Sequence, residues 1–172
     1  MDVDDRYLPV LREVDLLIAE AASLNAAGPR FVIAHRYCRD GVCLPGEEIA
    51  FVALAYRSRE FVLKISTAEK LLFECLARNC HFPQSATQLE AYVRTDAFFA
   101  MHGANALRSR LTRKISRAAI KVHVQRLRAA LAIAFAEAGL NLDPVRVLRE
   151  ERATGPLGYR LRATFEWRHL VK

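Results

Sequence analysis

The middle of the chain carries a dense set of basic side chains with no acidic residue among them. Between Ala97 and Ala136 there is no Asp or Glu, whereas the segment contains eight Arg and Lys residues. Guanidinium and ammonium groups without nearby carboxylates produce a positive potential that attracts polyanions. The chemistry indicated is therefore electrostatic and hydrogen-bonding recognition. The eight residues are Arg108, Arg110, Arg113, Lys114, Arg117, Lys121, Arg126 and Arg128.

The second half of this segment has the hydrophobic pattern of an amphipathic helix. Ile120, Val124 and Leu127 fall on one face of such a helix, which Leu131, Ala134 and Phe135 extend. We predict a helix from about 116 to 138 that ends at Gly139, with one face packed and the other free to bind. The residues on the other sides are Lys121, Val122, Gln125, Arg126 and Ala129.

Length and composition predict a folded domain. The chain has 172 residues, 52% of them hydrophobic, which is ample for a core. The formal net charge is +7 and the pI is near 9.6. No run approaches the roughly 18 to 20 apolar residues that span a bilayer. Because the acidic start at 1–6 is also unlike a signal peptide, we expect a cytoplasmic protein without membrane contact.

The elements around the basic helix can be read from local patterns. An amphipathic stripe at 7–24 predicts an N-terminal helix, which either packs on its own domain or pairs with a second subunit. Strands rich in Val, Ile, Phe and Tyr are predicted at 30–38, 48–57 and 60–65, forming a small antiparallel sheet.

Further signals complete the predicted order of elements. Ser66 and Glu69 form a capping box that opens a helix through about Asn79, with Cys75 in the core, and a second helix starts near Ser85. After the basic helix, strands at 145–148 and 158–165 form a hairpin with Arg149 and Arg152 near its tip. The predicted fold is α+β: an antiparallel sheet, three helices and a hairpin over 29–172, preceded by a helical extension over 1–28.

Two separated motifs resemble a known family of DNA-binding domains. Val122, His123, Val124, Arg126, Leu127 and Arg128 match the pattern R-T-V-D-V-H-I-x-R-L-R of the third helix in OmpR/PhoB winged-helix domains. Gly155, Gly158, Tyr159, Arg160 and Leu161 approximate the G-x-G-Y-R-L at the end of the wing. The resemblance covers about 31–163. It implies a winged helix-turn-helix fold, binding of double-stranded DNA and a role in transcription regulation.

The family resemblance also implies roles for individual residues. It assigns base-edge contacts to Arg126, with Lys121 and Gln125 beside it, and a thymine-methyl contact to Val122. It assigns phosphate contacts to His123, Arg128, Arg117 and Tyr159, although His123 is alternatively a spacer against the wing and Tyr159 alternatively a core residue. Arg113 and Lys114 precede the helix, where they would reach phosphate or polymerase.

The sequence departs from the family at several points. Ala118 and Ala119 stand where the family often has Arg and Thr, which removes two usual phosphate contacts, and Lys121 replaces a common acidic residue. About thirty residues precede the first predicted strand, too few for a receiver domain. We therefore expect either a stand-alone regulator or a part of a longer one, which binds as a homodimer through the N-terminal helix.

Other functions have less support in the sequence. No nucleophile elbow, P-loop, zinc-protease or dinucleotide motif is present, so we expect no enzyme and no cofactor. The main alternative is a winged-helix module that contacts RNA polymerase or another regulator. RNA binding is disfavoured because no aromatic platform accompanies the basic residues.

The four cysteines are too few for a disulfide scaffold and lack zinc-site spacing, so no metal is predicted. Cys38 and Cys43 flank a predicted two-residue turn at Asp40 and Gly41, which would place them opposite each other. They are either a redox pair or two reduced loop thiols.

Overall fold

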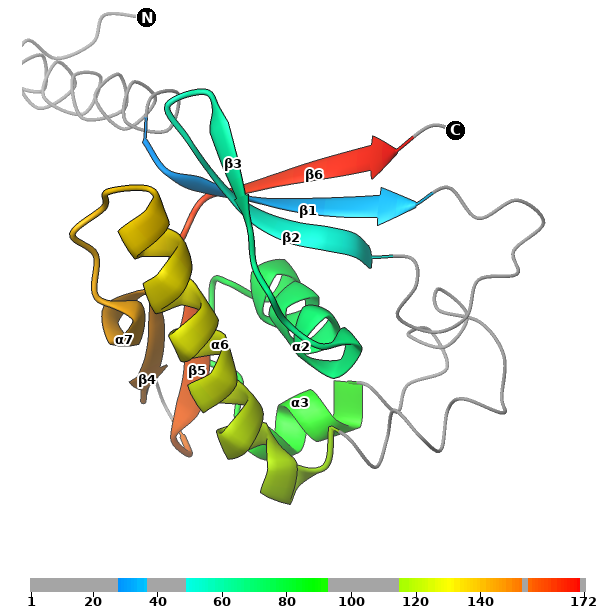
Figure 1. The fold of residues 1–172 in the computed structure, drawn as a ribbon. Coiled ribbons are helices and arrows are strands. Elements are labelled where there is room, and N and C mark those ends of the chain that lie inside the picture. Colours follow the sequence, from blue (N-terminus) through cyan, green and yellow to red (C-terminus); the bar gives the residue numbers. More distant parts are fainter. Residues whose placement is uncertain (1–27, 37–48, 93–114, 153–154, 171–172) are drawn as a thin grey trace, which may run out of the picture.

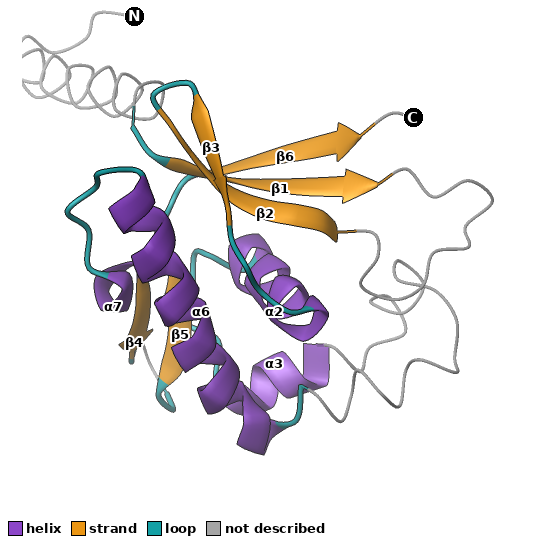
Figure 2. Cartoon of the chain, viewed as in Figure 1, coloured by secondary structure: helices purple, strands orange, loops and turns teal. Residues whose placement is uncertain are grey.

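The computed structural model describes residues 28–36, 49–92, 115–152 and 155–170. The predicted helix at 7–24 lies outside these residues, and so do Cys38, Cys43, Arg113 and Lys114. The described part is an α+β fold with a four-stranded sheet, helices on one side of it and a separate two-stranded sheet (Figure 1; Figure 2).

The four-stranded sheet contains the three predicted N-terminal strands and one further strand. β1 (Arg30–Arg36), β2 (Ile49–Tyr56) and β3 (Arg59–Val62) pair antiparallel, which confirms the predicted sheet. The strand order is β3-β2-β1-β6, and β6 (Phe165–Leu170) runs parallel to β1. The prediction of a single strand at 158–165 is therefore wrong, since Phe165 belongs to a different strand and sheet.

Two helices begin at reciprocal side-chain caps. In α2 (Thr67–Arg78) the Ser66 hydroxyl accepts from the Glu69 amide, and the Glu69 carboxylate accepts from the Ser66 amide, as the capping box predicts. α3 (Ala86–Tyr92) has the same exchange between Ser85 and Gln88. These bonds satisfy amide groups that the first helical turn leaves unpaired.

The long helix α6 (Arg117–Glu137) has both predicted ends. Ser116 caps its start by accepting a hydrogen bond from the Ala119 amide. At its end Gly139 has φ +69°, and the Leu140 amide donates to the Phe135 carbonyl at 2.8 Å. This is a Schellman ending, which favours glycine because a Cβ is strained at positive φ.

The core lies where the sheet, α2 and α6 meet. The Phe31 ring from β1 lies 5.2 Å from that of Phe73 in α2 and 6.4 Å from that of Phe135 in α6. Cys75 in α2 is buried in the same core, as predicted. α6 is thus fixed to the rest of the fold along its apolar face, which leaves its other faces at the surface.

The segment after α6 differs in part from the prediction. α7 (Pro144–Val147) is a single helical turn, so the predicted strand at 145–148 is wrong over its first three residues. The Asp143 carboxylate caps this turn by accepting from the Val145 amide, and proline at its first position suits a helical φ.

The second sheet pairs β4 (Leu148–Glu151) with β5 (Gly158–Leu161). Arg149 pairs with Arg160 within this hairpin, so it does not lie near the tip as predicted. Tyr159 and Gln84 exchange two backbone hydrogen bonds of 2.8 Å. The hairpin is therefore attached to the connection between α2 and α3.

Candidate nucleic-acid interface

The exposed side of α6 is the predicted one. Ile120, Val124 and Leu127 are buried together with His123, whereas the other residues between them face outward. Val122 keeps 51% of its surface exposed, although it is hydrophobic. The helical phase inferred from the sequence is therefore confirmed. The exposed residues in this first half of α6 are Arg117, Ala118, Lys121, Val122, Gln125 and Arg126.

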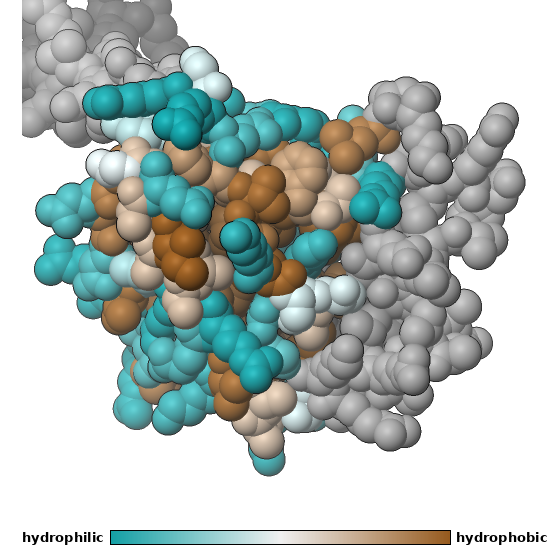
Figure 3. Space-filling model, in the orientation of Figure 1, coloured by the Kyte–Doolittle hydropathy of each residue, from teal (hydrophilic) through white to brown (hydrophobic). Residues whose placement is uncertain are grey.

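The basic residues of α6 all lie between Arg117 and Arg128. The side chains of Arg117, Lys121 and Gln125 make no hydrogen bond or ion pair with any other described residue. From 129 to 136 the helix has no charged residue, and Ile133 is 56% exposed. Hydrophobic side chains reach the surface beside α6 and β3 (Figure 3), and Ile133 lines a shallow hollow there with Val62.

His123 is buried and is held by an acidic side chain of another helix. Only 8% of its surface is exposed, and its Nδ1 lies 3.3 Å from Glu69 Oε1 of α2. The burial argues against the predicted phosphate contact, because the ring presents little surface to a ligand. The alternative, a partly buried spacer against the wing, agrees with this burial, and the contact that the structure shows is with Glu69 of α2.

Arg126 also lies near Glu69, but unlike His123 it is exposed. Its side chain is 64% exposed, and its Nη1 lies 3.8 Å from Glu69 Oε1. Burial raises the pKa of Glu69, but hydrogen bonds from the Ser66 amide and His123 outweigh it and leave the pKa below its ordinary value. Glu69 is therefore ionised at neutral pH, beside an arginine that has most of its surface free.

Arg128 has a structural contact. Its Nε and Nη2 both donate to the Leu148 carbonyl, at 3.0 and 2.9 Å, which ties α6 to β4. A guanidinium engaged in this way has fewer N–H groups left for a ligand. The predicted phosphate contact would have to use these remaining N–H groups. The prediction missed this bond because it joins residues 20 positions apart.

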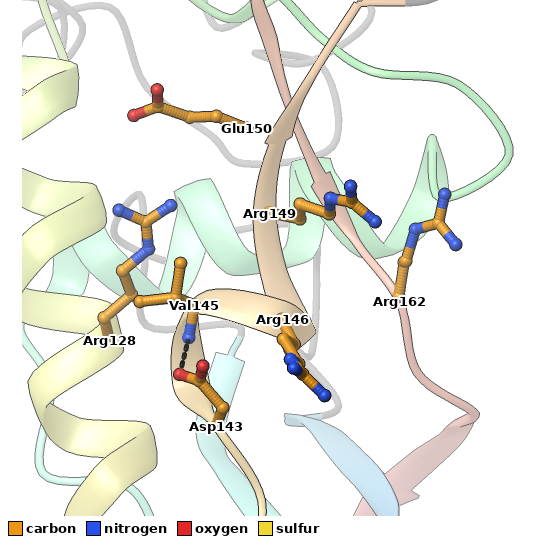
Figure 4. Close-up of a pocket in the computed structure, with 7 residues that line it drawn as sticks. All are labelled: Arg128, Asp143, Val145, Arg146, Arg149, Glu150 and Arg162. Atoms are coloured by element: carbon orange, nitrogen blue, oxygen red, sulfur yellow. Dashed lines mark hydrogen bonds between the residues drawn. The ribbon is translucent and has the colours of Figure 1, made fainter.

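The hairpin adds further basic residues, which border an open hollow of about 800 Å³ (Figure 4). Arg128 and Glu150 lie on one side of β4, and Arg149 lies on the other (Figure 4). Arg146 and Arg162 were not among the predicted site residues. The sequence held a signal for Arg162, because Arg160 and Arg162 have the i, i+2 spacing of one strand face. The hollow is lined by Arg128, Asp143, Val145, Arg146, Arg149, Glu150 and Arg162.

One carboxylate neutralises part of this charge. Glu151 accepts from Arg160 Nη1 at 3.1 Å and from Arg162 Nη2 at 2.8 Å. Desolvation raises the pKa of Glu151, but these two arginines outweigh it and lower the pKa. Arg146 and Arg149 have no ion pair with a described residue. The same holds for Arg152, so these three cations carry charge that no described carboxylate pairs with.

The remaining predicted residues differ in accessibility. Arg152 follows β4 and is exposed. Tyr159 is half-buried and packs against the core, and burial together with Glu150 raises its pKa, while Arg128 acts in the opposite direction. The core alternative for Tyr159 therefore has the stronger structural support. Arg113 and Lys114 lie outside the described residues, so their predicted phosphate contacts stay predictions.

Neither a metal site nor a membrane-spanning helix is found in the described ranges. No three His, Cys, Asp or Glu side chains there are close enough to hold a metal ion. None of the helices there is long and apolar enough to cross a membrane. Comparisons of the chain with models of protein families, with curated proteins and with solved structures found no match.

Proposed function

We propose that this chain is a winged-helix protein that binds double-stranded DNA in a sequence-specific manner and regulates transcription. The observation that carries the proposal is the free, basic first half of α6, whose opposite face is anchored in the core. A helix with side chains is about 10–12 Å wide and fits the major groove, which is about 12 Å wide. α6 is then the reading helix, and the β4–β5 hairpin is the wing.

The exposed residues divide into base-reading and phosphate-binding groups. Arg126 can donate two hydrogen bonds to one guanine, Lys121 and Gln125 can reach neighbouring base edges, and Val122 offers a methyl contact to thymine. Phosphate contacts fall to cations at the start of α6, in α7 and in the hairpin region, which set the register without reading sequence. They are Arg117, Arg146, Arg149 and Arg152.

The proposal extends to the assembly and location of the protein. A homodimer formed through 1–27 would place two reading helices on two half-sites, as in many helix-turn-helix proteins. Light scattering on the full chain and on a variant without residues 1–27 tests this, because only the full chain should dimerise. We place the regulator in the cytoplasm, where it needs neither metal nor cofactor.

Selection of bound duplexes from a genomic DNA pool, followed by binding isotherms, tests the function. The selected duplex should bind at least about 10³-fold more tightly than random duplex at the same salt concentration, which is the lower end for specific binders. Single-stranded RNA of the same sequence serves as the control. Equal affinity for all three nucleic acids would contradict sequence-specific reading.

The exposed apolar residues of the second half of α6 favour a second candidate, a contact with RNA polymerase or another regulator. Ile133 and Val62 are each more than half exposed and line the same hollow. Ile133→Glu separates the two functions, because it should abolish a protein contact and leave binding of the selected duplex unchanged. Loss of duplex binding would instead place Ile133 at the DNA interface.

A further inference from the structure

Glu69 makes a contact that helix capping does not explain. Its Oε2 accepts from the Ser66 amide at 2.8 Å, which completes the capping box of α2. Its other oxygen, Oε1, faces α6, where it lies 3.3 Å from His123 Nδ1 and 3.8 Å from Arg126 Nη1. A capping box needs only one of these oxygens and is formed equally well by glutamine. The carboxylate charge therefore has a second role, directed at α6.

The burial of the three side chains indicates what that role is. Glu69 is 4% exposed and His123 8%, whereas Arg126 is 64% exposed at its side chain. A carboxylate only accepts hydrogen bonds, so the Nδ1 that faces it carries the hydrogen. Glu69 and His123 are thus a buried, hydrogen-bonded pair. Arg126 lies over this pair and is the only one of the three side chains that can reach a ligand.

We propose that Glu69 is a positioning residue, which orients the Arg126 guanidinium for its contact with a base. The inference rests on the proposed DNA binding by α6. An arginine that is already held in place loses less conformational entropy when it binds, so its contact with the correct base is strengthened. The same negative charge disfavours a loose contact of Arg126 with phosphate. Both effects raise the affinity for the correct sequence relative to random DNA.

Glu69→Gln is the test substitution, because glutamine keeps the capping box and removes the charge. The selected duplex should bind about 3- to 10-fold more weakly, because the Arg126 side chain then has to be ordered when the DNA binds. Random duplex should bind equally well or more tightly, because one negative charge near the phosphates is gone. The control is Glu166→Gln, which removes a carboxylate paired with Arg30 and Arg168 on the sheet and should change neither affinity.

A double-mutant cycle with Arg126→Ala separates positioning from a merely structural effect. Glu69→Gln should have no further effect on the selected duplex when Arg126 is already alanine. Equal losses on both duplexes, additive effects in the cycle, or tighter binding of the selected duplex would overturn the inference. If Arg126→Ala leaves the ratio of the affinities for selected and random duplex unchanged, the proposed function fails. If Arg126→Ala lowers this ratio and Glu69→Gln leaves it unchanged, only the positioning role fails.

A measurement on the free protein covers the case in which Glu69→Gln does not fold. Nitrogen-15 relaxation at the side-chain Nε of arginine reports how ordered each guanidinium is. Arg126 should be more ordered than Arg117, which is on the same exposed helix and has no described partner. Equal disorder of the two side chains in the wild-type protein would overturn the inference.

Discussion

Gly158 sets how closely the hairpin approaches the connection between α2 and α3. A Cβ built at this position lies 2.9 Å from the Gln84 carbonyl carbon, 3.0 Å from the Gln84 amide nitrogen and 3.0 Å from Pro83 Cβ. Two of these atoms are backbone, so they cannot rotate away. Gly158→Ala must therefore move either the hairpin or the connection.

The cost can be worked out for the two ways in which the chain can respond. Keeping the hairpin in place overpacks this contact, which costs about 1–3 kcal/mol. Moving it away breaks the two backbone hydrogen bonds between Tyr159 and Gln84, at about 0.5–1.5 kcal/mol each. The chain takes the less costly response, so we expect a loss of about 1–3 kcal/mol in the free energy of unfolding.

Urea unfolding followed by fluorescence of Trp167, the only tryptophan, measures this loss. Gly155→Ala is the matched control, because a Cβ there meets nothing within 4 Å, and its effect should stay within about 0.5 kcal/mol. Gly139→Ala should cost about 1–2 kcal/mol for a different reason, the positive φ at the end of α6. A Gly158→Ala variant as stable as Gly155→Ala would refute the close-approach reasoning.

Three further predictions concern pH, thiol reactivity and salt. The lowered pKa of Glu69 contributes stability that is present above its unfolded pKa of about 4.5 and is lost as the pH falls below it. The urea midpoints of wild type and Glu69→Gln should therefore converge in acid, and a constant difference between them would contradict this. Burial raises the pKa of the Cys75 thiol to about 12. After treatment with an alkylating reagent, peptide mapping should find Cys75 modified only in unfolded protein, whereas half-buried Cys80 reacts in the folded state. Modification of Cys75 in the folded protein would refute its burial. Replacing Arg113 and Lys114 by Ala should weaken binding to selected and random duplex alike and flatten the salt dependence by about 0.9 per lost phosphate contact; a loss on the selected duplex alone would show base reading.

The sequence predicts well those features that depend on neighbours within a few residues. The capping box at Ser66 and Glu69, the phase of α6 and its end at Gly139 all rest on interactions across one or two helical turns. Such interactions are encoded locally, so their residues can be found by spacing alone. The prediction that Val122 and Gln125 lie at the surface was correct for the same reason.

Features that depend on distant residues were missed. β6 pairs with β1, and Arg30 meets Glu166 across 136 positions, which no local pattern reveals. At 145–147 an alternating apolar pattern suggested a strand, but the cap at Asp143 and the proline after it favoured a helical turn.

The candidate site shows the same division. His123 lies about 60° from Ile120 around the helix, at the border of the buried face, so its position alone did not decide between core and surface. The family resemblance made it a phosphate ligand, whereas its contact with Glu69, 54 residues away, holds it inside. Arg128 was likewise assigned to phosphate, although it donates to the Leu148 carbonyl.

The central claim is that the first half of α6 and the hairpin form the DNA-binding surface. An amide NMR titration of the full chain with the selected duplex tests it most directly, because each backbone amide reports separately. The largest shift changes should fall at 117–129 and 149–159, while the amides of β1, β2 and β3 stay nearly unchanged. Changes that are largest in the four-stranded sheet, or that leave α6 unaffected, would contradict the account.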